Sequence, residues 1–218
     1  MRTKIYVALL LVAGLIGPAA AQHGSQPLHQ HFDDAEHWAR VFDDPARAAW
    51  QKPDQVIGAL DLAPDASVAD IGAGTGYFSV RLARAVPQGR VYAVDVSPSM
   101  VRYLASRAAH EKLANLIAQQ ADPDDARLPH AVDVVLLVDT YHHIADRTAY
   151  FAKLRKSLSA TGRLAIIDFR VDSSVGPRHG RVASETVKAE LARAGYRLTA
   201  EHEFLPYQYF LVFAPSGG

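Results

Sequence analysis

The chain of 218 residues contains no cysteine, and this absence removes several chemistries at once. Without thiols, the protein has no disulfide bonds, no thiolate metal ligands and no cysteine nucleophile. Basic and acidic side chains number 23 each, so the formal net charge is zero. A chain without net positive charge gives no electrostatic reason to expect nucleic acid as a partner. The length suits one α/β domain and is too short for two ordinary ones.

Long apolar runs are also scarce, and the one at the N-terminus has the features of an export signal. Arg2 and Lys4 precede an apolar run over residues 5–17, and an Ala-x-Ala motif follows it. This pattern predicts a secretory signal peptide, residues 1–21, with cleavage before Gln22. Because the run is too short to span a bilayer comfortably, we expect no stable membrane span after cleavage and a periplasmic or secreted protein. The alternatives are an uncleaved membrane anchor and a misplaced start codon.

Residues 22–32 are predicted to form a polar linker, and residues 33–218 the folded domain. The linker contains the pair His29 and His31, a spacing that suits a divalent metal. No acid or further histidine recurs there at a chelating spacing, so we predict a solvated linker and no metal site. The domain begins with N-terminal helices within residues 33–61, expected at 33–43, 45–50 and 53–60.

From residue 67 to residue 214, strand-like and helix-like patterns alternate. This alternation predicts an α/β fold with a doubly wound, mostly parallel sheet of seven strands. The last two strands are separated only by Leu205 and Pro206, which predicts an antiparallel C-terminal hairpin. Gly162 and Gly195 are predicted to end helices. The expected strands are 67–71, 90–95, 115–120, 132–138, 163–169, 197–204 and 207–214, and the expected helices are 76–86, 98–111, 146–159 and 182–194.

The most informative stretch joins the first of these strands to the helix that follows it. It holds Asp70 and then glycine at every second position, at Gly72, Gly74 and Gly76, with a helix starting near Tyr77. Glycine permits positive φ and a close approach by a ligand. The free N–H groups of the helix point back toward the loop. The pattern indicates a binding turn for a nucleotide-like ligand.

The spacing and the charge help to choose the ligand. The glycines follow G-x-G-x-G, whereas a dinucleotide fingerprint is G-x-G-x-x-G. Asp70 would repel a pyrophosphate but suits a ligand that carries an ammonium or sulfonium group. The second strand ends in Asp95, which is placed to hydrogen-bond ribose hydroxyls. A nicotinamide-dependent oxidoreductase is therefore the less favoured interpretation.

Four sequence blocks together resemble the class I S-adenosylmethionine-dependent methyltransferases over roughly residues 54–214. They are D-I-G-A-G-T-G, V-Y-A-V-D-V-S-P-S-M, A-D-P-D-D-A-R-L-P and V-D-V-V-L-L-V-D-T-Y-H-H. The last block looks like the small-molecule enzymes related to ubiquinone and menaquinone C-methyltransferases. The resemblance implies a Rossmann-like methyltransferase fold with an N-terminal helical lid, S-adenosylmethionine as cofactor and a small-molecule methyl acceptor. Because S-adenosylmethionine is made in the cytosol, an exported, non-catalytic binding protein for S-adenosyl compounds is the alternative.

The resemblance also implies how the cofactor is held. Asp70 and the glycine-loop backbone would hold the methionine end, and Asp95 the ribose. Met100 would pack near the adenine, whose amino group Asp122 or Asp124 would bind. The cofactor-binding residues predicted in this way are Asp70, Gly72, Ala73, Gly74, Gly76, Tyr77, Asp95, Val96, Met100, Asp122 and Asp139.

The residues after the fourth strand are expected to face the transferred methyl group. Tyr141, His142 and His143 are the predicted catalytic residues. A histidine titrates near neutrality and serves as a general base if the acceptor must lose a proton. Tyr141 would orient the acceptor through its hydroxyl. The alternative is that both histidines cap the next helix or pack under it.

Overall fold

The computed structural model describes residues 34–177 and 179–217. The predicted signal peptide and polar linker, residues 1–32, lie outside this part of the chain. Within the described residues, no helix is long and apolar enough to cross a membrane. Over the same residues, no group of three or more His, Cys, Asp or Glu side chains is placed to hold a metal ion.

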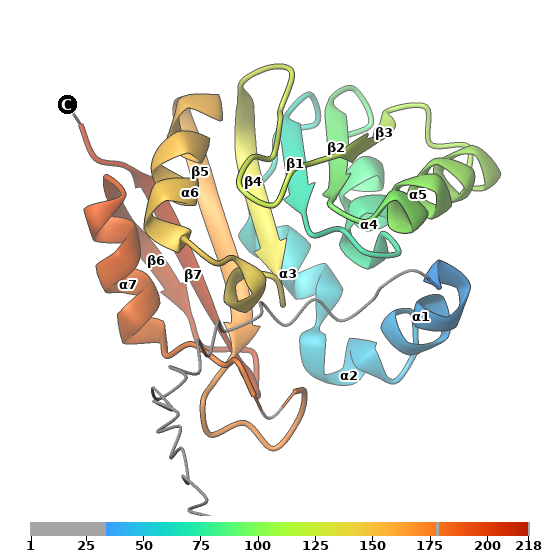
Figure 1. Ribbon diagram of the computed structural model, residues 1–218. Coiled ribbons are helices and arrows are strands. Elements are labelled where there is room, and N and C mark those ends of the chain that lie inside the picture. Colours follow the sequence, from blue (N-terminus) through green and yellow to red (C-terminus); the bar gives the residue numbers. More distant parts are fainter. Residues whose placement is uncertain (1–33, 178, 218) are drawn as a thin grey trace, which may run out of the picture.

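The core is one sheet of seven strands in the order β3-β2-β1-β4-β5-β7-β6. The first five strands pair in parallel, while β7 pairs antiparallel with β5 and β6. The predicted fold class is therefore confirmed (Figure 1). The strands are β1 (Ser67–Ile71), β2 (Arg90–Asp95), β3 (Leu116–Gln120), β4 (Val132–Val138), β5 (Leu158–Phe169), β6 (Tyr196–His202) and β7 (Gln208–Pro215).

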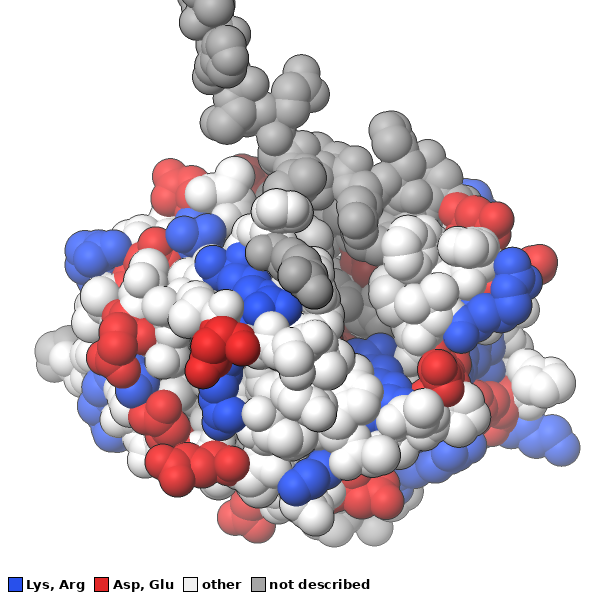
Figure 2. Space-filling view, turned by 90° about the horizontal axis from the view of Figure 1, so that it is seen from below, with Lys and Arg blue, Asp and Glu red and all other residues white. Residues whose placement is uncertain are grey.

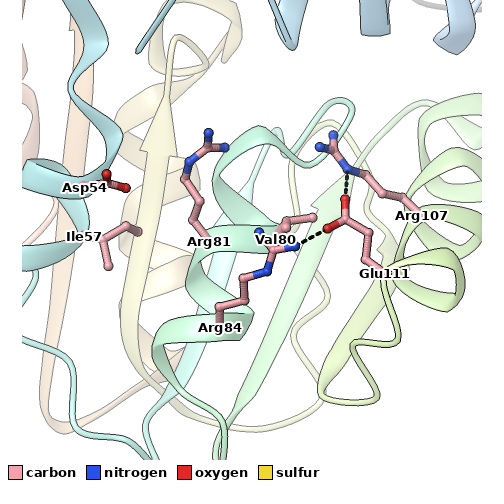
Figure 3. A pocket seen from close by; sticks show the side chains of 7 residues that line it. All are labelled: Asp54, Ile57, Val80, Arg81, Arg84, Arg107 and Glu111. Atoms are coloured by element: carbon pink, nitrogen blue, oxygen red, sulfur yellow. Dashed lines mark hydrogen bonds and ion pairs between the residues drawn. The ribbon is translucent and has the colours of Figure 1, made fainter. Parts of the chain in front are cut away.

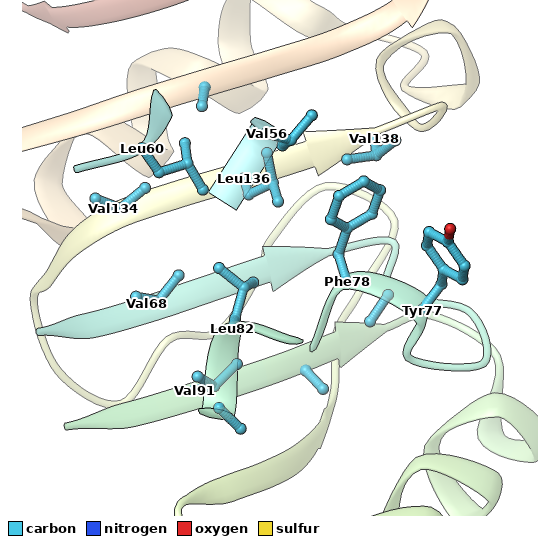
Figure 4. Packing of buried hydrophobic residues seen from close by; sticks show 14 of the residues in the cluster. Val56, Leu60, Val68, Tyr77, Phe78, Leu82, Val91, Val134, Leu136 and Val138 are labelled. Carbon is cyan, nitrogen blue, oxygen red and sulfur yellow. The ribbon is translucent and has the colours of Figure 1, made fainter. Parts of the chain in front are cut away.

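Helices cover both faces of the sheet. One apolar cluster joins α3, α4 and α5 to the sheet and includes Val56, Leu82 and Leu136, all fully buried (Figure 4). A second cluster, with Phe151 and Leu191, joins α6 and α7 to the opposite face. The helices are α3 (Pro53–Ala59), α4 (Tyr77–Ala85), α5 (Pro98–His110), α6 (Arg147–Leu154) and α7 (Ser184–Arg193), with 3-10 turns η1 (Tyr141–His143) and η2 (Arg155–Ser157).

The prediction that Gly162 ends a helix is wrong. After α6 and η2 the chain is already in β5 at Leu158, which pairs with Val132 of β4. The next register pair is Arg163 with Val134, so residues 159–162 bulge out of the ladder. A glycine in a strand bulge and a glycine after a helix look alike in a sequence. Gly195, with φ 87°, does follow α7 as predicted.

Two N-terminal helices, α1 (Ala35–Phe42) and α2 (Arg47–Gln51), lie beneath the carboxyl ends of the parallel strands (Figure 1). Asp34 caps α1 by accepting a hydrogen bond from the backbone N–H of His37 at 2.9 Å. Trp50 of α2 packs near Phe169 at the end of β5 and near Tyr207, with ring centroids 5.8 and 6.3 Å away. These contacts bring the N-terminal helices to the edge where parallel α/β sheets bind ligands.

Candidate active site

The glycine loop has the backbone that its spacing predicts. Gly72, Gly74 and Gly76 have φ angles of 72°, 56° and 89°. Gly72 and Gly76 are also needed for close packing within the protein, apart from any ligand. A Cβ atom on Gly72 would lie 2.3 Å from Oγ1 of Thr140, and one on Gly76 would lie 2.8 Å from a methyl group of Leu104. The loop therefore packs closely against the end of β4 and against α5.

Asp95, at the end of β2, is held against this loop. One carboxylate oxygen accepts the backbone N–H of Gly74 and the other that of Ser97, each at 2.9 Å. Burial raises the pKa of the Asp95 carboxyl, while these backbone hydrogen bonds act to lower it. Val96 contributes a further backbone hydrogen bond, so the carboxylate has a fixed position and keeps only part of its acceptor capacity. This is the geometry expected of a residue that binds a pair of ribose hydroxyls.

Asp70, at the centre of the sheet, is almost completely buried, with 3% of its surface exposed. Its carboxylate accepts a hydrogen bond from the hydroxyl of Ser79 at 2.5 Å. Burial raises the pKa of Asp70 to about 6, with the charge of Asp95 adding to the effect and the Ser79 hydrogen bond opposing it. A buried carboxylate with one neutral partner has capacity for a cationic group.

Two buried hydroxyls of the glycine loop have no hydrogen-bond partner among the described residues. They are Oγ1 of Thr75 and the phenol of Tyr77, and the two residues are 1% and 6% exposed. Buried polar groups are nearly always paired, so these two require a partner that the described chain does not supply. Two guanidinium groups pack on the Tyr77 ring, that of Arg47 at 4.4 Å and that of Arg81 at 4.0 Å from the ring centroid.

A polar cluster connects α2, the end of β4 and the start of β7. Asp139, with φ 55°, accepts hydrogen bonds from the side-chain amides of Gln208 at 2.6 Å and Gln51 at 3.2 Å. Arg47 lies 3.6 Å from the same carboxylate. Burial, with the nearby charge of Asp168, raises the pKa of Asp139 to about 6, and Arg47 and the two amides act against this.

His142 forms a buried pair with Asp168 at the end of β5. Its Nδ1 atom lies 2.8 Å from one Asp168 oxygen, and the side chains are 7% and 1% exposed. Burial acts to lower the pKa of His142, but the hydrogen bond and charge of Asp168 outweigh it and raise the pKa. This arrangement holds the imidazole with Nε2 directed away from Asp168, as in bases oriented by a carboxylate. The His143 ring packs on that of His142, with centroids 4.1 Å apart.

Tyr141 is placed differently from the prediction that it orients an acceptor. The side chain is fully buried, and its hydroxyl donates to Glu190 of α7 at 2.6 Å. Arg147 of α6 binds both oxygens of the same glutamate, at 2.6 and 3.0 Å. Because the hydroxyl is engaged between α6 and α7, the contacts assign Tyr141 a structural role.

Of the remaining predicted cofactor residues, some are buried and others are exposed. Ala73 donates its backbone N–H to Val94 at 3.0 Å, and Met100 is 1% exposed within α5. Val96, by contrast, is 48% exposed. Asp122 forms an ion pair with Arg127, and the side chain of Asp124 is 85% exposed beside Lys153. The adenine contact assigned to Asp122 or Asp124 stays a prediction.

A hollow of about 500 Å³ lies on the outer side of the glycine loop, between α3, α4 and α5 (Figure 3). Arg84 and Arg107 meet at Glu111 there, at 2.5 and 3.1 Å. Arg107 also donates to the carbonyl of Thr75 and to Asp43 at the end of α1, both at 2.8 Å. The hollow is therefore bordered by residues that brace the loop. The chemistry-bearing side chains lie elsewhere, at the carboxyl ends of the strands.

Figure 2 views the molecule from the side of those carboxyl ends. On the part of this face formed by described residues, basic and acidic side chains are interspersed among uncharged ones. A mixed surface of this kind fits a small ligand better than a polyanion.

The sequence interpretation missed four residues of this edge, which are Arg47, Gln51, Asp168 and Gln208. Asp168 was detectable, because it ends a predicted parallel strand and such ends share one edge of the sheet. The glutamines carried no such signal: they meet across 157 positions of the chain.

Comparison with known proteins agrees with this geometry. A family model described as a methyltransferase domain matches residues 62–203, more than half of the chain. The chain belongs to this family. The resemblance to class I S-adenosylmethionine-dependent methyltransferases is confirmed, and so, at the level of the family, is the cofactor.

Solved structures show the same fold. An S-adenosylmethionine-dependent methyltransferase from Aquifex aeolicus is 25% identical, with a TM-score of 0.76, and the match covers 83% of this chain and 97% of that one. The magnesium protoporphyrin IX methyltransferase of Synechocystis PCC 6803, solved with bound S-adenosylmethionine, is 22% identical. Its TM-score is 0.65, and the match covers 85% and 93% of the two chains.

Among curated proteins, the malonyl-(acyl-carrier protein) O-methyltransferase of Acetivibrio thermocellus is 26% identical over 174 residues. That alignment covers 79% of this chain and 57% of the relative. The chain thus spans little more than half the length of this relative. The two proteins share a family, but the methyl acceptor of the relative is not assigned to this chain.

Proposed function

We propose that this protein transfers the methyl group of S-adenosylmethionine to a small-molecule acceptor. The observation that carries the proposal is the position of Asp95, fixed at the tip of β2 by the backbone N–H groups of Gly74 and Ser97. It lies within the segment that matches the methyltransferase-domain family.

The residues around the glycine loop fit such a cofactor. Asp95 has acceptor capacity for the ribose hydroxyls, and buried Asp70 is suited to the ammonium group of the methionine end. The hydroxyls of Thr75 and Tyr77, which have no partner among the described residues, offer further hydrogen bonds. When bound, S-adenosylmethionine supplies a methyl group already activated on a sulfonium. The chain therefore has to orient the acceptor and exclude water from it.

His142 is the proposed general base. Asp168 fixes the Nδ1 side of its ring, which leaves Nε2 to accept the proton that an acceptor loses when it is methylated. The ring edge that carries Nε2 lies near Gly180, where an added Cβ would be 3.7 Å from Cδ2 of His142.

Turnover separates this proposal from the alternative of a non-catalytic binding protein. Purified protein is incubated with methyl-labelled S-adenosylmethionine and the small-molecule fraction of a cell extract. The proposal predicts label in a small molecule and one equivalent of S-adenosylhomocysteine per methyl transferred. A His142→Gln variant is expected to slow transfer by about 10²- to 10⁴-fold and to bind S-adenosylhomocysteine as before. Saturable binding without any S-adenosylhomocysteine formation would favour the binding protein.

We further propose that the protein is exported. Support comes from the sequence: Arg2 and Lys4 precede a short apolar run and an Ala-x-Ala motif. Cell fractionation followed by N-terminal sequencing tests this directly. A mature protein that begins at Gln22 outside the cytoplasm is expected, and an intact N-terminus in the cytosolic fraction would contradict it.

A further inference from the structure

We infer that Arg47 of α2 recognises a carboxylate of the bound ligand, the α-carboxylate at the methionine end of S-adenosylmethionine. The inference rests on the proposed function and assigns a residue that the glycine-loop motif does not include. It makes α2 part of the cofactor site.

Arg47 is a buried cation in the middle of the candidate site. Its side chain is 15% exposed, and its guanidinium group packs on the ring of Tyr77 at 4.4 Å. Tyr77 is the first residue of α4, directly after the glycine loop. The acids Asp70 and Asp139 both interact electrostatically with Arg47. A guanidinium group stays charged in any such environment.

The hydrogen bonds of Arg47 are incomplete. Of its five N–H donors, the Nε donor binds the side-chain oxygen of Gln51, and one on NH1 binds the carbonyl of Phe42 at 2.8 Å. Among the described residues, the NH2 group has only Asp139, at 3.6 Å, which is too long for a hydrogen bond. Both oxygens of Asp139 already accept hydrogen bonds from Gln51 and Gln208. The NH2 edge of the guanidinium group can therefore donate hydrogen bonds to a further hydrogen-bond acceptor.

The residues around Arg47 restrict which chemical group can accept its hydrogen bonds. A planar, bidentate oxyanion matches the guanidinium fork. A phosphate group would bring more negative charge close to two carboxyls, that of buried Asp70 and that of Asp139, whose side chain is 22% exposed. An α-amino acid group carries a carboxylate for Arg47 and an ammonium group for Asp70 on adjacent bonds. S-adenosylmethionine and S-adenosylhomocysteine both end in this group.

Three ligands measured by calorimetry on the full chain isolate the contact. S-adenosylhomocysteine carries the complete amino-acid end, its decarboxylated form lacks only the carboxylate, and 5′-methylthioadenosine lacks the whole amino-acid end. The Arg47→Gln variant is expected to bind S-adenosylhomocysteine about 10- to 100-fold more weakly, the usual range for a lost hydrogen bond to a charged group. It should bind the other two ligands within about twofold of the wild type.

Arg81→Gln is the matched control, because Arg81 packs on the same ring and forms no ion pair among the described residues. We expect this variant to bind all three ligands as the wild type does. An Arg47→Gln variant that loses affinity equally for all three ligands would give Arg47 a purely structural role and overturn the inference. Unchanged affinity for S-adenosylhomocysteine would overturn it as well. A wild-type protein that binds no S-adenosylhomocysteine would instead refute the proposed function.

Discussion

The carboxylate of Asp168 lies 2.8 Å from Nδ1 of His142, and both side chains are buried at the carboxyl edge of the sheet. The two residues come from different elements, η1 and the end of β5, so this pair exists only in the folded protein. It fixes the orientation of the imidazole and raises the pKa of His142 against the opposing effect of burial.

An Asp168→Asn substitution tests whether this pair serves proton transfer. Because the base must be neutral, the rate rises with pH as His142 loses its proton. Without the Asp168 charge the pKa of His142 falls, so this limb of the pH–rate profile moves to lower pH. Loss of the orienting carboxylate lowers the plateau rate by at least about tenfold. Asp172→Asn, in an exposed stretch of the loop after β5, serves as control. An unchanged limb in Asp168→Asn would exclude His142 as the base.

Tyr141→Phe separates a structural residue from a catalytic one. The substitution removes the hydrogen bond to Glu190, which keeps its two bonds from Arg147. We expect a loss of about 1–2 kcal/mol in the free energy of unfolding, measured by urea denaturation, with turnover changed by less than about threefold. A large fall in turnover at unchanged stability would instead show that Tyr141 takes part in catalysis.

The pH dependence of stability tests the burial of Asp70. Its pKa is raised from 3.8 to about 6 in the folded protein. A group with a raised folded pKa contributes stability below its unfolded pKa, and that contribution is lost as pH rises through the folded pKa. The Asp70→Asn variant has no titrating group at this position, so it does not lose this stability as pH rises. The free energy of unfolding of the variant, relative to the wild type, should therefore increase between pH 4 and pH 7, by up to about 3 kcal/mol. A difference that stays constant over this range would contradict the buried position of the carboxyl.

Asp43→Ala tests whether α1 is held on the glycine loop. Asp43 binds Arg107, which also donates to the carbonyl of Thr75, so one guanidinium group links α1, α5 and the loop. Removing the carboxylate costs about 1 kcal/mol locally, so the amides of α1 should exchange hydrogen roughly fivefold faster while those of β4 stay unchanged. Glu36→Ala, on the same helix, is the control. Equal exchange in both variants would mean that the ion pair does not hold α1.

The sheet was predictable because local signals and the global fold agree. Apolar runs separated by amphipathic segments indicated the strands, and Asp95 was placed correctly by its distance from the glycine loop. The sequence does not show side-chain direction. The motif placed Tyr141 toward the acceptor, but the short turn η1 directs it between α6 and α7. Nor does it show contacts such as that of Gln51 with Gln208, which depend on how α2 packs against β7.

One calorimetric titration shows whether the glycine loop and Asp95 bind S-adenosylmethionine. S-adenosylhomocysteine is titrated into the wild-type protein and into Asp95→Ala. We expect saturable binding at one site per chain. We also expect Asp95→Ala to bind about 10- to 100-fold more weakly, because the variant loses acceptors for the ribose hydroxyls and for the N–H groups of Gly74 and Ser97. Absence of binding to the wild type, or equal affinity in Asp95→Ala, would contradict this assignment.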